Sequence, residues 1–284
     1  MTDPRQSRPI ESTPRERILS TARHQVVEHG MTVSLEHLSL EKIIRASGVS
    51  RATAYRIWPN KQQFLADVLV DAVRSTDLEV DSRAEVAQLV ALLDASPGFA
   101  SDEHARRNVI VEGLRISIQA DFERVAASAQ WATYLALNAT NHGLPDGPLR
   151  DEVTQALAEM QQVFIEQRCI VYARLPRLLG YRLVPPLDGD QGFRLMSEAS
   201  GALMTGFVAE LGARPQLLAD TFQIAAYGAD KRDWTMPTFA LTGLLLSYIE
   251  PDPDVIWDDA QLARAHATLE EITTELEHSW TAGR

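Results

Sequence analysis

The fold of this chain is decided by one stretch near its start, Ala46-Ser47-Gly48-Val49-Ser50-Arg51-Ala52-Thr53-Ala54-Tyr55-Arg56-Ile57-Trp58-Pro59-Asn60-Lys61. Ser39 is placed to cap a short helix over residues 40–46. Gly48 supplies the positive φ angle that a tight turn between two helices needs. Ser50 is a good cap for a second helix, which Pro59 ends. The pattern predicts a helix-turn-helix.

In a helix-turn-helix the second helix lies in the major groove of DNA with its N-terminal residues toward the bases. That placement would expose Arg51, Ala52, Thr53 and Arg56. Arg51 is the first candidate for a base contact, because a guanidinium can bind a guanine edge through two hydrogen bonds. The methyl group of Ala52 is suited to a thymine methyl group. The alternative is an ordinary helical hairpin whose charges are solvated.

The charge is distributed unevenly along the 284 residues, whose formal net charge is -12. Residues 1–62 hold ten Lys and Arg against six Asp and Glu, a net charge of +4. The remaining residues hold 17 basic and 33 acidic side chains, a net charge of -16. A basic N-terminal part on an acidic body suits a protein that touches phosphate only with that part.

The segment resembles the DNA-binding domain of TetR-type transcriptional regulators over residues 14–70. The residues that carry the resemblance are Gly48-Val49-Ser50, Thr53, Tyr55, Trp58 and Lys61. The chain departs from the family at Ile44, where a small Ala is usual, and at Ala54, where Leu is usual. Both positions lie in the packing between the two helices, so we interpret them as a large-for-small exchange that roughly conserves volume.

The resemblance implies that the hydroxyl group of Tyr55 contacts a phosphate. Lys61 is also assigned a phosphate, because the positive end of the next helix dipole adds to its charge. Ser39 and Ser50 are candidates for further contacts to the DNA backbone. Trp58 is expected in the core.

The chain is predicted to be all-α, with a disordered tail over residues 1–12, the helix-turn-helix domain over residues 13–62 and a helical ligand-binding and dimerisation domain over residues 63–284. Thr13 and Glu16 form a capping box for a first helix that ends at Gly30, and Asn60 caps a fourth helix. No strand is predicted. Further helices are expected over residues 83–95, 103–119, 122–141, 149–175, 192–211, 216–226, 238–249 and 259–280.

The compartment is predicted from cysteine content and hydropathy. Cys169 is the single cysteine of the sequence, so no intrachain disulfide can form, and a reducing cytoplasm is the simplest setting. No signal peptide is predicted. The longest apolar run, residues 238–249, is shorter than the ~20 residues of a membrane span, so no membrane partner is expected.

The resemblance also implies that the body binds a small molecule and forms a homodimer. Trp131 and Tyr134 share one helix face with Asn138, and aromatic rings around a buried amide suit a pocket lining. The alternative is an aromatic core with Asn138 bonded internally. A second helix carries small residues four apart, which favour close helix packing either with a second copy or within the chain. They are Ser197, Gly201 and Thr205.

A homodimer would place two recognition helices about one DNA turn apart, so the operator should be a near-palindrome. An effector in the body would shift the dimer between two conformations that differ in the spacing of the recognition helices, acting through the fourth helix. The role of repressor is implied by the family alone. The alternative is a helical interaction protein of the same family that has lost specific DNA binding.

An enzyme is not expected. The sequence lacks a Gly-Lys-Ser/Thr phosphate loop, a dinucleotide glycine fingerprint and a His-Glu-x-x-His pair, and no cofactor is predicted. The seven histidines are scattered, and His104, His142 and His266 have no carboxylate or cysteine partner at metal spacing, so no metal site is predicted.

Overall fold

The computed structural model describes residues 12–29, 38–76, 78, 83–96, 98–258, 260–269 and 271. The chain forms two compact units. Unit 1 comprises Met1–Asp77 and Ala129–Gln161, and unit 2 comprises Leu78–Ser128 and Gln162–Arg284. Helices dominate both units among the described residues, so the all-α prediction is confirmed.

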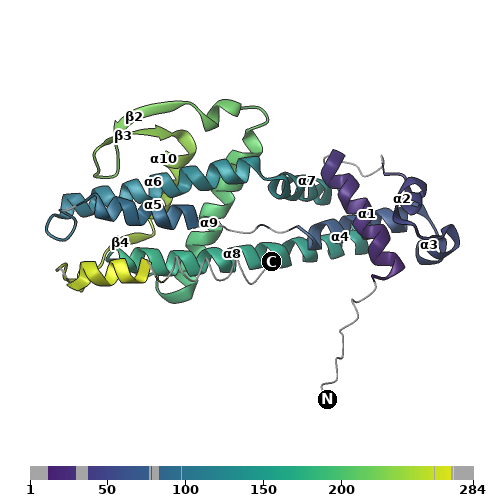
Figure 1. Cartoon of the computed structure of the whole chain (residues 1–284), viewed down its shortest axis with the longest axis horizontal. Coiled ribbons are helices and arrows are strands. Elements are labelled where there is room, and N and C mark those ends of the chain that lie inside the picture. Colours follow the sequence, from purple (N-terminus) through teal and green to yellow (C-terminus); the bar gives the residue numbers. More distant parts are fainter. Residues whose placement is uncertain are drawn as a thin grey trace, which may run out of the picture. The chain divides into compact units, whose positions relative to one another are not determined.

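Unit 1 holds the N-terminal helices, the whole of α7 and the first part of α8 (Figure 1). The helix α1 contacts α2, α3 and α4, and α4 contacts α7. The long helix α8 contributes its first half, up to residue 161. The bounds are α1 Pro14–His29, α2 Leu40–Ser47, α3 Arg51–Ile57, α4 Lys61–Arg74, α7 Ala129–Gly143 and α8 Pro148–Leu178.

Local capping rules set the ends of these helices, as the sequence predicts. Thr13 and Glu16 exchange two hydrogen bonds, of 2.7 and 3.2 Å, in a capping box that starts α1. The side chains of Ser50 and Asn60 cap α3 and α4. Gly48 has φ +68° after α2, the left-handed conformation that favours glycine.

A compact core holds the first four helices together. Ile18, Ile43 and Phe64 are fully buried on α1, α2 and α4. Trp58, which follows α3, is 2 % exposed and meets Phe64 edge to face with ring centroids 5.4 Å apart. Such a pair stabilises beyond the apolar area it buries, so α3 is anchored from its C-terminal end.

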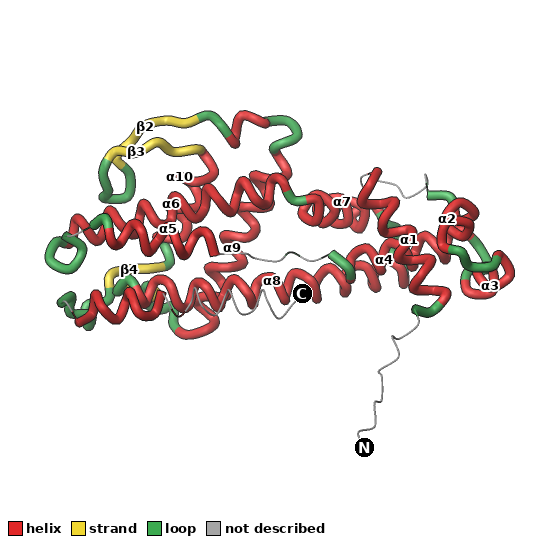
Figure 2. Tube along the Cα trace, in the orientation of Figure 1, coloured by secondary structure: helices red, strands yellow, loops and turns green. Residues whose placement is uncertain are grey.

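Unit 2 is built around α6, which contacts α5, α9 and α10. The helices α5 and α6 run side by side (Figure 2). The bounds are α5 Arg83–Asp94, α6 Glu103–Ala127, α9 Gly189–Glu210 and α10 Met236–Leu246, with the second half of α8 and a helix over residues 260–269.

The absence of strands was wrongly predicted. Residues 216–226, expected as a helix, form a short 3-10 helix Pro215–Leu218 and the strand β2 Thr221–Ala225, which pairs antiparallel with β3 Lys231–Thr235. A second pair joins β1 Tyr181–Leu183 to β4 Ile249–Pro251. The backbone of β2 forms its hydrogen bonds with β3. The apolar pattern of residues 216–226 alone does not predict this pairing.

Several of the expected helices have other bounds: the helix expected over residues 238–249 ends at Leu246, and Ile249 lies in β4. We expected a break between residues 119 and 122, but α6 continues to Ala127, and the break falls at Ser128, whose backbone is extended. Phe122 therefore belongs to α6, and Asp121 lies inside that helix. The predictions for residues 1–11, for Gly30 and for residues 259, 270 and 272–280 concern positions outside the described residues.

Within the described ranges, none of the helices combines the length and the apolar character that a membrane span requires.

Candidate nucleic-acid interface and ligand cavity

The helix α3 presents a polar face to solvent. Arg51, Ala52 and Arg56 are exposed, and the aromatic side chain of Tyr55 is 42 % exposed. Thr53 is half-buried, with its hydroxyl 2.9 Å from that of Ser50. The structure therefore brings the predicted base-contacting residues together on one accessible helix.

The opposite side of α3 is packed into the domain. Val49, Ala54 and Trp58 are buried, and Ala54 has no exposed surface. Ile44 on α2 is buried as well. A small Ala54 and a large Ile44 in one core fit a volume-conserving exchange of the residues usual in the family.

Arg51 has an internal partner in this structure. Its guanidinium lies 3.1 Å from a carboxylate oxygen of Glu41, and both side chains are more than half exposed. An ion pair this exposed contributes only about 0–1 kcal/mol. A guanine edge or a phosphate can therefore displace Glu41 from Arg51 at little cost.

The serines and Lys61 occupy helix starts. The hydroxyl of Ser39 accepts from the backbone N–H of Lys42 at 3.4 Å, and that of Ser50 accepts from the N–H of Thr53 at 3.1 Å. The hydroxyl oxygens of both serines therefore cap a helix. Lys61 is exposed at the first position of α4.

A hydrogen-bond network that the sequence does not predict joins α1 to α4. Asp67 accepts from the indole N–H of Trp58 at 2.9 Å and from Arg15 at 2.8 and 3.2 Å. Arg23 pairs with Asp71 in the same way, at 3.1 and 3.3 Å. Arg15 thus links α1 to α4 through Asp67. Only the i, i+4 spacing of the two aspartates on one helix face hints at this role.

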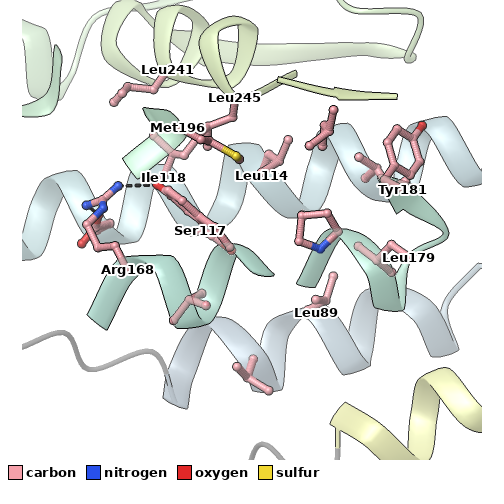
Figure 3. A pocket seen from close by; sticks show the side chains of 18 of the residues that line it. Leu89, Leu114, Ser117, Ile118, Arg168, Leu179, Tyr181, Met196, Leu241 and Leu245 are labelled. Carbon is pink, nitrogen blue, oxygen red and sulfur yellow. Dashed lines mark hydrogen bonds and ion pairs between the residues drawn. The ribbon is translucent and has the colours of Figure 1, made fainter. Parts of the chain in front are cut away.

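Unit 2 encloses a cavity of about 150 Å³. Side chains from α6, α8, α9 and α10 surround it, and most are aliphatic (Figure 3). Figure 3 shows Arg168 at one side of the pocket and Leu89, Leu179 and Tyr181 at the other. An apolar pocket with a few convergent polar groups is the usual form of a small-molecule site.

The polar corner of the cavity is built around Arg168 on α8. This side chain is 8 % exposed, contacts the hydroxyl of Tyr172, and lies 3.4 Å from Asp121 and 3.3 Å from the hydroxyl of Ser200. Asp121 also pairs with Arg124 at 3.0 Å. Burial opposes the charged form of Arg168, but Tyr172 and Asp121 outweigh it and raise the pKa.

The aromatic residues that we expected around a ligand lie elsewhere. Trp131 and Tyr134 are buried in unit 1, edge to face at 5.4 Å. The side-chain amide of Asn138 donates to the backbone carbonyl of Tyr134 at 2.9 Å. None of the three lines the cavity of unit 2. The structure matches the alternative that the sequence left open, an aromatic core with Asn138 bonded internally.

The small-residue stripe on α9 has two environments. Ser197 is fully buried, and its hydroxyl lies 3.4 Å from the thiol of Cys169, so it packs within the chain. Gly201 and Thr205 are half-buried, and the space beside Gly201 is open. Of the three predicted interface residues, only these two reach the surface.

The capped α2–turn–α3 unit with its exposed basic face defines a helix-turn-helix domain. Residues 18–68 match the family model described as bacterial regulatory proteins, tetR family. The N-terminal domain is therefore similar to the DNA-binding domain of the tetR family, as its motif predicts.

Curated relatives include proteins described as uncharacterized HTH-type transcriptional regulators. Two from strains of Mycobacterium tuberculosis are each 36% identical over 121 residues, and one from Mycobacterium bovis is 35% identical over 121 residues. The match covers 39% of this chain and 62% of each relative.

Proposed function

We propose that this protein is a transcriptional regulator that binds a near-palindromic operator as a homodimer and is switched by a small molecule in unit 2. The observation that carries the proposal is the exposed face of α3, with Arg51, Ala52 and Arg56 accessible at a helix whose other side is buried. The role of repressor rests on the family's usual behaviour.

The docking on DNA follows from the helix directions. The N-terminal end of α3 carries Arg51 and Ala52, so these two residues meet base edges in the major groove. Tyr55 and Lys61 take phosphates, which fix the register of the helix without reading sequence. The capping hydroxyls of Ser39 and Ser50 accept their internal bonds through oxygen lone pairs, and a serine O–H is also a donor that suits a phosphate oxygen.

The dimer is supported by apolar side chains exposed on unit 2. Val163 and Ile170 are each 56 % exposed, and they lie seven residues apart on one face of α8. Leu195 on α9 is exposed too. Large apolar residues gathered on two helices suit a four-helix interface with a second copy, to which Gly201 and Thr205 add close packing.

The ligand site is assigned to the cavity of unit 2 rather than to Trp131, Tyr134 and Asn138. An effector there can change DNA binding only through a difference in its affinity for two conformations of the protein. The helix α8 lines the cavity and is shared by the two units along the chain, since residues 148–161 fall in unit 1. Together with α4, it is a candidate route for the coupling.

The test is binding of the purified full-length protein to DNA from upstream of its own gene, followed by selection from random-sequence DNA. The wild type should bind a preferred site as two protomers. Arg51→Ala should cost about 1–3 kcal/mol and relax the preference at one base position. Arg174→Ala removes an exposed cation of unit 2 and should leave the affinity unchanged.

The rival proposal predicts a different result. A family relative that acts as an interaction protein would select no sequence from the random pool, and its weak binding to DNA would be equal for wild type and Arg51→Ala. Either finding would overturn the regulator proposal.

A further inference from the structure

The cavity of unit 2 contains a buried cation that the protein satisfies only in part. The Nε atom of Arg168 is buried and has no hydrogen-bond partner among the described residues. Leaving a buried donor unpaired costs about 1–3 kcal/mol, and more when the group is charged. Arg168 lines the cavity, so the side chain that needs a further acceptor borders the space in which a ligand would lie.

The charged residues around the cavity carry a net positive charge, which favours an anionic ligand. Among the lining residues, which all fall in the described part of the chain, the charged ones are Asp121, Arg124 and Arg168. The carboxylate of Asp121 lies 3.0 Å from Arg124 and 3.4 Å from Arg168. One carboxylate thus faces two guanidinium groups, and the longer distance is to the more deeply buried Arg168.

The rest of the lining is too apolar to favour a second charged group on a ligand. Most of the remaining lining is aliphatic, with Leu89, Leu114, Met196, Leu241 and Leu245 among its residues, and Tyr181 and Ser117 also border the cavity (Figure 3). A volume of about 150 Å³ corresponds to about ten to fifteen water-sized spaces. The space therefore suits an apolar body of about ten non-hydrogen atoms with a single anionic end.

We propose that the cavity binds a small amphiphilic carboxylate, with its carboxylate group against Arg168 and its apolar body among the aliphatic side chains of α6, α9 and α10. This inference rests on the ligand site of the proposed regulator and names the chemical class of its effector. A guanidinium suits a carboxylate because its planar donors match the two oxygens. Tyr172 and Ser200, which already contact Arg168, hold the guanidinium in place.

The test compares three probes of one chain length, octanoate, 1-octanol and octylamine, by calorimetry on the full-length protein without DNA. Octanoate should bind at least tenfold more tightly than 1-octanol, because a charge-assisted hydrogen bond is about twice as strong as a neutral one. Octylamine should bind most weakly, since its charge repeats that of Arg168. Equal affinity for octanoate and 1-octanol, or no binding of octanoate at millimolar concentration, would overturn the proposal.

A pair of variants locates the contact. Arg168→Gln should weaken octanoate at least tenfold and change 1-octanol little, whereas Arg174→Gln, on the same helix but exposed and outside the cavity lining, should change neither. Arg168→Lys should give an intermediate loss, since Lys keeps the charge without the planar donors. If Arg168→Gln does not fold, the comparison of the three probes on the wild type still decides.

The two proposals fail in different ways. If octanoate binds selectively but leaves the affinity for the operator unchanged, the carboxylate site is supported and the proposed control of DNA binding by a ligand is overturned. If the operator is bound specifically and octanoate does not bind, the carboxylate inference falls and DNA-binding regulation stands.

Discussion

Asp67 is the residue on which three parts of the helix-turn-helix domain converge. It lies on α4 and accepts hydrogen bonds from the indole of Trp58, after α3, and from Arg15 on α1. Trp58 is almost fully buried, and the side chain of Asp67 that accepts from it is 37 % exposed. The position of α3, and with it the placement of Arg51, depends on a carboxylate remote from DNA.

Asp67→Ala should therefore destabilise the protein by about 1–3 kcal/mol, the cost of leaving a buried indole N–H unpaired. Asp67→Asn keeps an oxygen at the same place and should lose less. Urea unfolding followed by tryptophan fluorescence measures both. An Asp67→Ala protein as stable as the wild type would show that the network contributes nothing.

The same residues show what a sequence can predict at this scale. The caps of Ser39, Ser50 and Asn60 are predicted because each bond spans only three residues. The bond from Arg15 to Asp67 spans 52 residues, and no local pattern specifies it. For that reason the exposed contact face is readable from the motif, whereas the network that supports it is not.

At the scale of elements, the β2–β3 hairpin is the part that the sequence does not reveal. Apolar residues at 222 and 224 fit either a helix or a strand in a short run. Tertiary contacts stabilise the strand, because Trp234 of β3 is buried and Tyr227 packs against Phe239 of α10. The cavity was missed for a similar reason, because its lining comes from segments between residues 86 and 249.

Glu112 on α6 ties this hairpin to its helix. It accepts hydrogen bonds of 2.7 and 2.8 Å from Arg115 and lies 3.5 Å from Arg232 of β3. The hydrogen bonds from Arg115 lower the pKa of Glu112, and the charges of Arg115 and Arg232 add to this, although burial opposes it. A carboxylate whose pKa is lowered by folding stabilises the protein above its unfolded pKa, and this stability is lost as pH falls through the folded pKa.

Glu112→Gln should consequently be less stable than the wild type by about 1 kcal/mol at about pH 7. The difference should shrink as the pH falls from the ordinary value of 4.5 through the lowered folded pKa of Glu112, because the carboxylate becomes protonated there. Urea unfolding of both proteins across this range measures it. Glu159→Gln, an exposed change on α8, should shift stability by no more than about 0.5 kcal/mol, and a pH-independent effect of Glu112→Gln would refute the assigned role.

At the scale of the whole molecule, the assembly of two copies decides how many recognition helices meet DNA. Val163→Glu with Ile170→Glu places charges on the exposed apolar face of α8 and should convert the proposed dimer to a monomer. Sedimentation equilibrium measures the mass, and the operator affinity should fall with it, since a monomer grips one half-site. Ile256→Glu changes a residue that is 79 % exposed elsewhere in unit 2 and should leave the dimer intact. A double variant that remains dimeric would place the interface on another surface.

The segregation of charge, +4 over residues 1–62 and -16 over the rest, makes the salt dependence of DNA binding a test of the whole arrangement. Each phosphate contact releases about one counterion, so the slope of log Kobs against log salt counts such contacts.

Lys61→Ala should reduce that slope by about 1 per protomer, and so by about 2 for a dimer on its operator. It should weaken operator and random DNA alike, because a phosphate contact carries no sequence information. Arg51→Ala should instead lower the ratio of operator to random affinity. If Lys61→Ala lowered this ratio and left the slope unchanged, Lys61 would read bases, and the assignment of α4 to the phosphate backbone would be wrong.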